Sequence, residues 1–329
     1  MKRRKTERRK RRFSWRRLLA VVLLMTMLIM LMRLAWYGYF AALGEGASAA
    51  TPFEAIVHLK AKVIKLANGR MASDTADSGG AANESDGLPP VIPFAVQEIT
   101  NTHFGALVNA EYGIRDVPAS SLVPAWPTVF VLSKDITLNK TALKAISEMF
   151  TAASAANIGS FYISSGFRDY HKQQQVYDEQ ANKSYVQLPG HSEHETGLAA
   201  DLMVSGLTRD DVAASPQGEW LAGNAWQYGL ILRYPQDKQS ITGVAYEPWH
   251  FRYVGQPAAW YCEQNNLCFE EYIQFLKDKG GYSAMVGSIK YFVFYETPQE
   301  GMIHVPVGWN YNVSGDNTGG YIITVWEKQ

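Results

Sequence analysis

The stretch from Pro189 to Asp201 constrains this chain more than any other. It reads Pro-Gly-His-Ser-Glu-His-Glu-Thr-Gly-Leu-Ala-Ala-Asp, so histidines and acids stand among glycines that allow tight turns. A second unusual stretch, Tyr246 to His250, reads Tyr-Glu-Pro-Trp-His. Histidine nitrogens and carboxylate oxygens are good ligands for zinc. A fold that uses both stretches for one metal site must bring them together from separate elements.

Three residues in these stretches are candidate metal ligands. Residues 197–204 alternate as a strand does, and Asp201 stands on one face among small or apolar neighbours. A lone aspartate there costs stability unless it is paired or bound to a metal. His250 opens another apolar strand, and His194 lies in a glycine-flanked loop. A single such histidine is most often a hydrogen-bonded core residue, but the three together predict a zinc site at His194, Asp201 and His250.

Two further residues are candidates for the chemistry. Glu247 precedes His250 by three positions across Pro248, so its carboxylate can face the same site and act as general base on a water. Arg168 follows a strand and could stabilise an oxyanion or hold a substrate carboxylate. The alternative for Glu247 is a surface glutamate before a turn, and the alternative for Arg168 is a structural salt bridge. The helical His-Glu-x-x-His motif is absent because residue 198 is leucine, so His191 is expected near the ligands or on the surface.

The combined motifs resemble those of VanY-type D-alanyl-D-alanine carboxypeptidases, in the zinc peptidase group that includes the VanX dipeptidases. The resemblance covers roughly Gln97 to Lys279 and continues more loosely beyond it. The family pattern Ser-x-His-x-x-Gly-x-Ala-x-Asp, the pattern Glu-Pro-Trp-His and the Ser-Gly-aromatic-Arg segment are all complete, at Ser192, His194, Gly197, Ala199 and Asp201, at Glu247 to His250, and at Ser165 to Arg168. Phe167 stands where many relatives have tyrosine.

The resemblance implies a function and roles for particular residues. It implies a zinc-dependent D,D-carboxypeptidase that removes the terminal D-alanine from peptidoglycan stem peptides or their precursors. Glu247 would be the base and Arg168 would stabilise the oxyanion, with substrate contacts from Gln173, Ser192 and Trp249. A D,D-dipeptidase, an L,D-carboxypeptidase, an endopeptidase or a non-catalytic cell-wall binding module are the alternatives. A degenerate binder would be expected to lose Glu247 or a ligand, and none is lost. A role in antibiotic resistance and one in ordinary wall maturation both stay open.

The N-terminus predicts a membrane segment. The chain has 31 Lys or Arg and 31 Asp or Glu, and residues 1–17 hold eleven of the basic residues and one of the acidic ones. The rest of the chain therefore has 20 basic and 30 acidic residues. The acidic body argues against nucleic-acid binding. Residues 18–32 are almost wholly apolar and extend past Arg33 to residue 43, long enough to cross a bilayer. The positive-inside rule then places the basic tip in the cytoplasm and the body outside the cell. A cleavable signal peptide ending near Ala47 to Ala49 is the alternative.

The chain is expected to have five parts. These are a basic tip (1–17), a membrane anchor or signal segment (18–43), a stalk and flexible linker (44–94), a zinc peptidase domain (95–280) and a β-rich C-terminal extension (281–329). The linker is indicated by Gly, Ala, Ser, Asp and Pro in residues 68–93. The fold class is α+β, and the resemblance adds a central antiparallel sheet flanked by helices.

Several elements are predicted from residue patterns. Strands are expected at residues 129–132, 161–165, 197–204, near 230 and at 249–254, and helices near 141–153, 169–180, 219–228, 257–265 and 269–279. The tail is expected to add a small hairpin from residues 291–295 and 320–326. Cys262 and Cys268 could form a local disulfide, act as a pair of metal ligands or be two inert thiols.

Overall fold

The computed structural model describes residues 91–98, 101–114 and 121–327. Two compact units divide the chain, Met1–Glu54 and Ala55–Gln329, and all described residues belong to the second. The basic tip, the predicted membrane segment and most of the stalk therefore lie outside the described residues. Within the described ranges, every helix is too short or too polar to span a bilayer.

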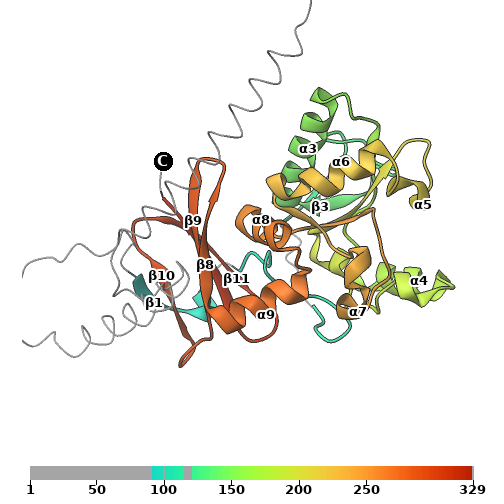
Figure 1. Ribbon diagram of the computed structural model, residues 1–329. Coiled ribbons are helices and arrows are strands. Elements are labelled where there is room, and N and C mark those ends of the chain that lie inside the picture. Colours follow the sequence, from blue (N-terminus) through green and yellow to red (C-terminus); the bar gives the residue numbers. More distant parts are fainter. Residues whose placement is uncertain (1–90, 99–100, 115–120, 328–329) are drawn as a thin grey trace, which may run out of the picture. The chain divides into compact units, whose positions relative to one another are not determined.

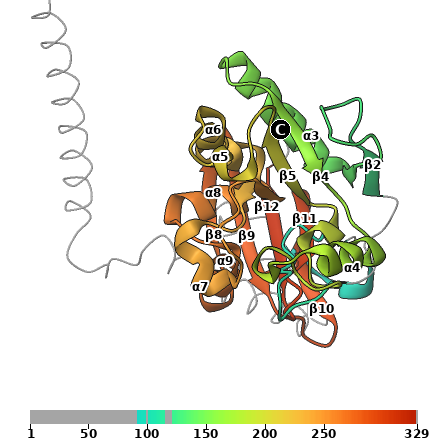
Figure 2. The same ribbon diagram turned by 90° about the vertical axis from the view of Figure 1, so that its right-hand side faces the viewer.

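A four-stranded antiparallel sheet forms the centre of the predicted domain of residues 95–280, and the predicted mixed α and β composition with antiparallel sheets is confirmed (Figure 1). Its strands are β4 (Phe161–Ser165), β5 (Ala199–Val204), β7 (His250–Tyr253) and β6 (Leu230–Leu232), in that order across the sheet. Figure 2 shows β4 and β5 side by side. All residues of β5 are buried, because β5 is an inner strand covered on both faces.

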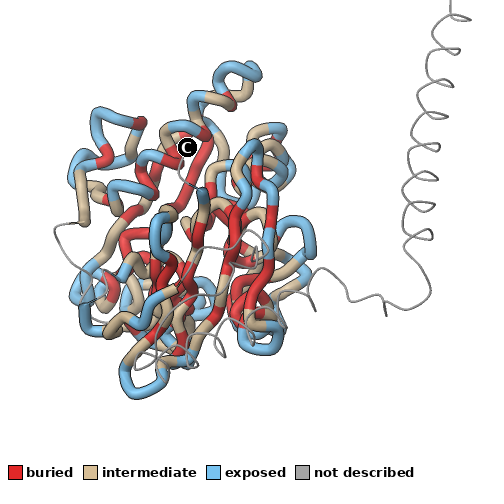
Figure 3. The backbone as a smooth tube through the Cα atoms, turned by 90° about the vertical axis from the view of Figure 1, so that its left-hand side faces the viewer, coloured by how far each residue is buried: buried red, intermediate tan, exposed pale blue. Residues whose placement is uncertain are grey.

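One face of this sheet packs on helices. Helix α3 (Lys140–Ala155) is capped at its N-terminus by Asn139, whose side chain accepts a hydrogen bond from the Thr141 amide. Helix α6 (Pro216–Asn224) lies over the same apolar cluster, to which β5 contributes Ala200, Leu202 and Val204. The predicted alternation of β5 is thus confirmed, since Asp201 is left on the other face. Figure 3 shows the buried residues gathered in the interior of the fold and the exposed residues toward its outside.

The remaining elements of this domain are short or peripheral. Strand β2 (Leu122–Pro124) pairs with β3 (Thr137–Asn139). Helix α4 (Tyr170–Glu179) is capped by Asp169, whose side chain accepts a hydrogen bond from the Lys172 amide. The others are α5 (Arg209–Val212), α7 (Gln239–Thr242) and the 3-10 turns Val96–Glu98, Lys183–Tyr185, Glu193–Thr196, Ala225–Tyr228 and Gln236–Lys238.

Residues after 280 form more than the expected hairpin. A second antiparallel sheet has the order β11 (Asn310–Gly315), β12 (Tyr321–Trp326), β9 (Ile289–Glu296) and β8 (Gly281–Val286). Its β8 and β9 pack on α8 (Gln256–Asn265) and α9 (Phe269–Lys279) through one apolar cluster (Figure 1). The hairpin prediction was too small because β8 and β11 contain many small or polar residues, which weaken the strand pattern.

A separate pair of strands joins the start of the described chain to its C-terminal region. Strand β1 (Val91–Ala95) pairs antiparallel with β10 (Met302–Pro306), and Val91 stands opposite Pro306. The predicted linker therefore ends in a strand rather than in flexible chain. The other boundaries of the five predicted parts stay predictions.

Two local predictions have clear outcomes. The strand at residues 129–132 was wrong: Val131 makes only an isolated bridge to Ile163, while Phe130 and Leu132 are 72% and 69% exposed. The run pairs with β4 only at Ile163, whose carbonyl accepts from the Leu132 amide and whose amide donates to the Phe130 carbonyl, so it forms one bridge rather than a strand. Cys262 and Cys268 are both free and buried, so the disulfide is not formed in this structure.

Candidate metal centre and active site

Strand register brings the candidate ligands together. Asp201 on β5 stands opposite His250 on β7 and opposite Ser165 on β4, where β4 carries one extra residue between Ile163 and Ser165. Such a bulge redirects the side chains that follow it. His194 comes from the 3-10 turn that leads into β5. Gly197 closes this turn at φ 70°, and a side chain there would lie 2.5 Å from Leu122.

His194, Asp201 and His250 offer a compact set of ligand atoms. One atom from each lies within 4.8 Å of the others, and all three residues are buried. The Asp201 Oδ1 atom is 3.3 Å from His194 Nε2 and 3.1 Å from His250 Nδ1. The sequence-predicted ligands are thus placed in one cluster that can hold a metal ion.

The His194 ring is fixed so that one nitrogen is free for a metal. Its Nδ1 atom donates to the Gly166 carbonyl at 2.7 Å, which leaves the Nε2 lone pair toward Asp201. Burial, together with the nearby Arg168 guanidinium, lowers the pKa of His194 to about 4. A neutral imidazole is the form that binds metals.

A buried acid orients the His250 ring so that Nδ1 faces the cluster, whereas His194 faces it with Nε2. The Nε2 atom of His250 lies 3.6 Å from Glu193 Oε2, and Nδ1 faces Asp201. Burial alone would lower the pKa of His250, but its contacts with Asp201 and Glu193 outweigh that effect and raise it to about 9. A divalent cation at the cluster would displace that proton, because it needs the lone pair on Nδ1.

Glu193 belongs to a buried ionic network that the motif analysis did not find. Its Oε1 atom accepts from Arg233 Nε at 2.8 Å and lies 3.1 Å from Arg252 Nη1. Arg233 also donates to both oxygens of Glu270, at 2.8 and 2.6 Å. Burial alone would raise the pKa of Glu193, but the two arginines hold it well below the usual range. The only sequence signal was the position of Arg233 and Arg252 next to or within apolar strands.

Glu247 lies beside the metal cluster without being one of its three members. Its Oε2 atom is 3.7 Å from His250 Nδ1, and the residue is 5% exposed. Burial raises the pKa of Glu247 to about 7. A carboxyl group poised near neutral pH can exchange protons with a substrate or a water.

Arg168 is held at the edge of the cluster. Its Nε atom donates to Ser165 Oγ at 3.1 Å and its Nη1 to Gln173 Oε1 at 3.0 Å, while Nη2 lies 3.5 Å from Asp201 Oδ2. Gln173 is itself fixed by a hydrogen bond from Nε2 to the Gln187 carbonyl at 2.7 Å. Gln173, predicted as a substrate contact, therefore positions the Arg168 side chain.

A cavity of about 210 Å³ joins these groups. The cavity is lined by the predicted substrate contacts Ser192 and Trp249, together with Arg168, Gln173, Glu247 and the three metal candidates. His191 lies elsewhere: its Nδ1 atom contacts the Asn109 carbonyl at 2.7 Å and it lines a different cavity. Glu195 also turns away, because its carboxylate accepts from the Gly190 and Ser192 amides.

Sequence reasoning missed a second cavity arginine. Arg209 begins helix α5, its guanidinium lies 5.1 Å from the Trp249 ring centre, and Nη2 is 3.8 Å from Asp201 Oδ2. The half-exposed Arg209 and the partly buried Arg168 give the cavity two positive groups beside one aspartate. Nothing in the local pattern singled out Arg209, because a helix-starting arginine is ordinary on a surface.

Comparisons with known proteins agree with this site. The family VanY, D-alanyl-D-alanine carboxypeptidase, matches residues 135–256. A D-alanyl-D-alanine carboxypeptidase of Enterococcus faecium is 40% identical over 231 residues, which are 67% of this chain and 74% of that protein. The bifunctional D-Ala-D-Ala dipeptidase and D-Ala-D-Ala carboxypeptidase VanXYC of Enterococcus gallinarum is 43% identical over 99 residues, 29% of this chain and 52% of that protein.

A solved structure extends the likeness to the fold. The vancomycin resistance D,D-dipeptidase VanXYg, in complex with a D-Ala-D-Ala phosphinate analog, aligns with a TM-score of 0.63 at 31% identity. The alignment covers 73% of this chain and 100% of that chain. The chain belongs to the VanY family of D-alanyl-D-alanine carboxypeptidases, as its motifs predicted.

Proposed function

We propose that this protein is a zinc-dependent D,D-carboxypeptidase that removes the terminal D-alanine from peptidoglycan stem peptides or their precursors. The observation that carries the proposal is the joint placement of His194, Asp201, His250 and Glu247 around one cavity in a chain of this family. Family membership supplies the substrate class, and the geometry supplies groups suited to hydrolysis.

The donor set fits zinc. Two imidazoles and one carboxylate leave a position open for water or substrate, as catalytic zinc sites do. Both rings are held by a contact on the nitrogen away from the cluster, to Gly166 and to Glu193. Zinc bound there would polarise a carbonyl and lower the pKa of a water.

Glu247 takes the proton in this proposal. Its carboxylate lies on the cavity side of His250 and is close enough to the cluster to reach a water that attacks the scissile carbonyl. The same carboxyl group can then give the proton to the departing amine of D-alanine. Burial supports this exchange because it keeps the pKa of Glu247 near neutral pH.

Arg168 supplies positive charge where the substrate is negative. Its guanidinium lines the cavity beside Asp201 and is held by Ser165 and Gln173, so it loses little freedom when an anion binds. It stabilises the oxyanion that develops during attack. Gln173, Ser192 and Trp249 complete the wall that meets the D-alanine end.

The protein is further proposed to act at the outer face of the cell membrane. The basic tip of residues 1–17 and the apolar run of residues 18–43 support a single span with a cytoplasmic N-terminus. This arrangement places the catalytic domain where stem peptides are exposed.

The proposal is tested with the full-length protein and a pentapeptide that ends in D-Ala-D-Ala. Release of one D-alanine is expected. This activity should be lost on treatment with a chelator and should return when zinc is added. Free D-Ala-D-Ala and a tetrapeptide ending in a single D-alanine serve as competing substrates. Faster cleavage of free D-Ala-D-Ala would indicate a dipeptidase, faster cleavage of the tetrapeptide an L,D-carboxypeptidase, and chelator-resistant activity would reject the metal mechanism.

A further inference from the structure

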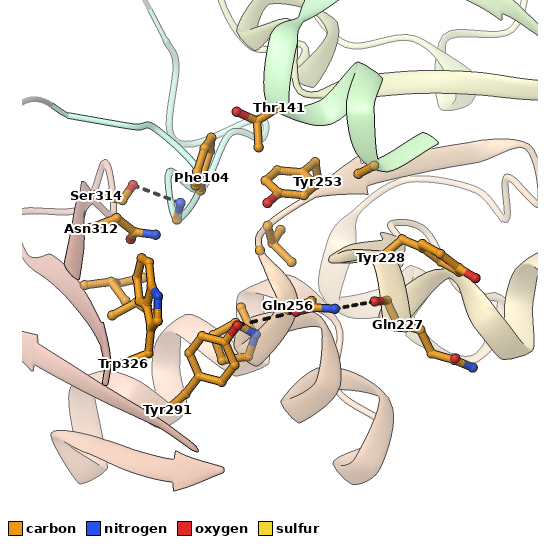
Figure 4. A pocket seen from close by; sticks show the side chains of 18 of the residues that line it. Phe104, Thr141, Gln227, Tyr228, Tyr253, Gln256, Tyr291, Asn312, Ser314 and Trp326 are labelled. Atoms are coloured by element: carbon orange, nitrogen blue, oxygen red, sulfur yellow. Dashed lines mark hydrogen bonds between the residues drawn. The ribbon is translucent and has the colours of Figure 1, made fainter. Parts of the chain in front are cut away.

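A second and larger cavity lies away from the catalytic residues. It encloses about 450 Å³ between the C-terminal sheet and the peptidase domain, and is here called the aromatic groove (Figure 4). Among the described residues, none lines both this groove and the catalytic cavity. Its principal side chains come from several elements: Phe104, Tyr228, Tyr253, Gln256, Tyr291, Asn312, Thr324 and Trp326.

Strand register builds one wall of the groove. Asn312 stands opposite Thr324 across β11 and β12, and Trp326 stands opposite Tyr291 across β12 and β9. Alternation along a strand places these side chains on one face of the sheet. The Trp326 and Tyr291 rings lie with centroids 6.0 Å apart, which gives this wall an aromatic surface.

The opposite wall is fixed by the peptidase domain. The Tyr253 ring lies edge-on to Phe104 with centroids 5.0 Å apart, and Gln256 donates to the Gln227 carbonyl at 2.6 Å. Gln256 also accepts from the Tyr291 hydroxyl at 3.4 Å, so a hydrogen bond crosses from one wall to the other (Figure 4). Ser314 accepts from the Gly105 amide at 2.9 Å and closes another side. The groove is therefore preformed, as ligand sites commonly are.

Several polar groups in the groove have unused hydrogen-bonding capacity. Across the described part of the chain, the structure gives no hydrogen-bond partner to the side chains of Asn312, Thr324 and Trp326. These groups are an amide, a hydroxyl and an indole N–H, which together donate and accept. A ligand that offers hydroxyl and acetamide groups would satisfy them.

The charge of the groove selects a neutral ligand. Its only charged lining side chains within the described ranges are Lys144 and Glu148, which lie one turn apart on α3 and pair with each other. Such a pair offers no net charge to a phosphate or to a cation. Aromatic rings, amides and hydroxyls without net charge suit the apolar faces and polar edges of sugar rings.

We propose that the aromatic groove binds a glycan strand of N-acetylated amino sugars. The choice of amino sugars rests on the proposed function, because stem peptides are attached to such a strand. The apolar face of a sugar ring stacks on Trp326, which Tyr291 supports from the side, and Asn312 pairs with the acetamide group. Strand β7 begins at the metal candidate His250 and ends at the groove residue Tyr253, about 10 Å along the chain. A bound strand is thereby held close to the catalytic cavity.

The test uses the full-length protein and a β-1,4-linked tetrasaccharide of N-acetylglucosamine, which carries no peptide. Calorimetry is expected to show binding that Trp326→Ala or Asn312→Leu weakens about tenfold or more. The matched control is Tyr311→Ala, a 42% exposed residue that is next to Asn312 on β11 but is not part of the groove. Maltotetraose, which lacks acetamide groups, is expected to bind at least about tenfold more weakly.

Separate readouts keep the two proposals distinguishable. D-alanine release from a sugar-free pentapeptide is expected to stay at the wild-type rate in all three variants, which also shows that they are folded. If Trp326→Ala fails to fold, Trp326→Phe and Asn312→Leu decide the question. Absence of tetrasaccharide binding, equal binding by wild type and Asn312→Leu, equal binding of maltotetraose, or displacement by the pentapeptide would overturn the groove assignment. Tetrasaccharide binding without peptide hydrolysis would instead overturn only the proposed activity.

Discussion

At the scale of single residues, the metal candidates depend on partners that point away from the metal. His194 is held by a backbone carbonyl, whereas His250 is held by the carboxylate of Glu193. That carboxylate is balanced by Arg233 and Arg252, both fully buried. The order is therefore arginine, glutamate, histidine, and each group fixes the next, up to the position where a metal would bind.

Glu193→Gln tests whether this order matters for the metal. Loss of the charge next to His250 Nε2 is expected to weaken zinc affinity about 10- to 100-fold. Competition with a chromophoric chelator measures the affinity. The matched control is Glu270→Gln, which removes a carboxylate from the other end of Arg233 without touching His250. An equal loss of affinity in the control would show that the effect is structural.

Glu247→Gln separates proton transfer from metal binding. The substitution keeps the size of the side chain and removes its basicity, so turnover is expected to fall about 100-fold or more while zinc stays bound. Asp201→Ala is expected to lose zinc and activity together. Elemental analysis and D-alanine release measure the two effects. Loss of zinc from Glu247→Gln would make this residue a ligand, and near-normal turnover would remove it as the base.

The sequence motifs named the residues of the metal cluster but not what supports them. Each short motif carries its candidate residues within a few positions of one another, as with His194 and Asp201 or with Glu247 and His250. Arg233 and Glu270 lie 37 positions apart and meet only in the folded chain. Pairs of this kind depend on which strands and helices are neighbours, which a single sequence does not contain.

At the scale of elements, strand register brings the candidate ligands together. Asp201 meets His250 because β5 pairs with β7 in one register, and a slip by one residue would turn Asp201 to the helical face. Periodicity predicted the existence of β4, β5 and α3 correctly because each has a clear buried face. It could not predict β1, whose partner β10 lies more than two hundred residues later.

The packing of the C-terminal sheet on α8 and α9 gives a stability prediction. Ile322 on β12 is 5% exposed and lies in the apolar cluster that these helices share with the sheet. Ile322→Ala is expected to lower the free energy of unfolding by about 2–5 kcal/mol in urea denaturation. The control is Ile241→Ala, which is 46% exposed and should change it by less than about 0.5 kcal/mol. A near-zero effect of Ile322→Ala would show that the sheet does not stabilise the domain.

At the scale of the whole molecule, the separation of charge predicts a topology. The eleven basic residues of the tip are expected to stay in the cytoplasm while the acidic body is outside. Protease added to intact cells should therefore cleave within residues 68–90. Protection of this segment in intact cells, with cleavage only after lysis, would reject the orientation.

The β1–β10 pair decides how the body responds to mechanical load. Tension applied through the residues that precede Val91 enters at the rung between Val91 and Pro306 and acts on five residue pairs. This pair is a separate sheet from β5 and β7, the strands that carry Asp201 and His250, so the load meets the pair first. A swelling or shrinking cell wall that drags on the chain would therefore strain the edge of the C-terminal region first, and the spacing of His194, Asp201 and His250 would be unaffected.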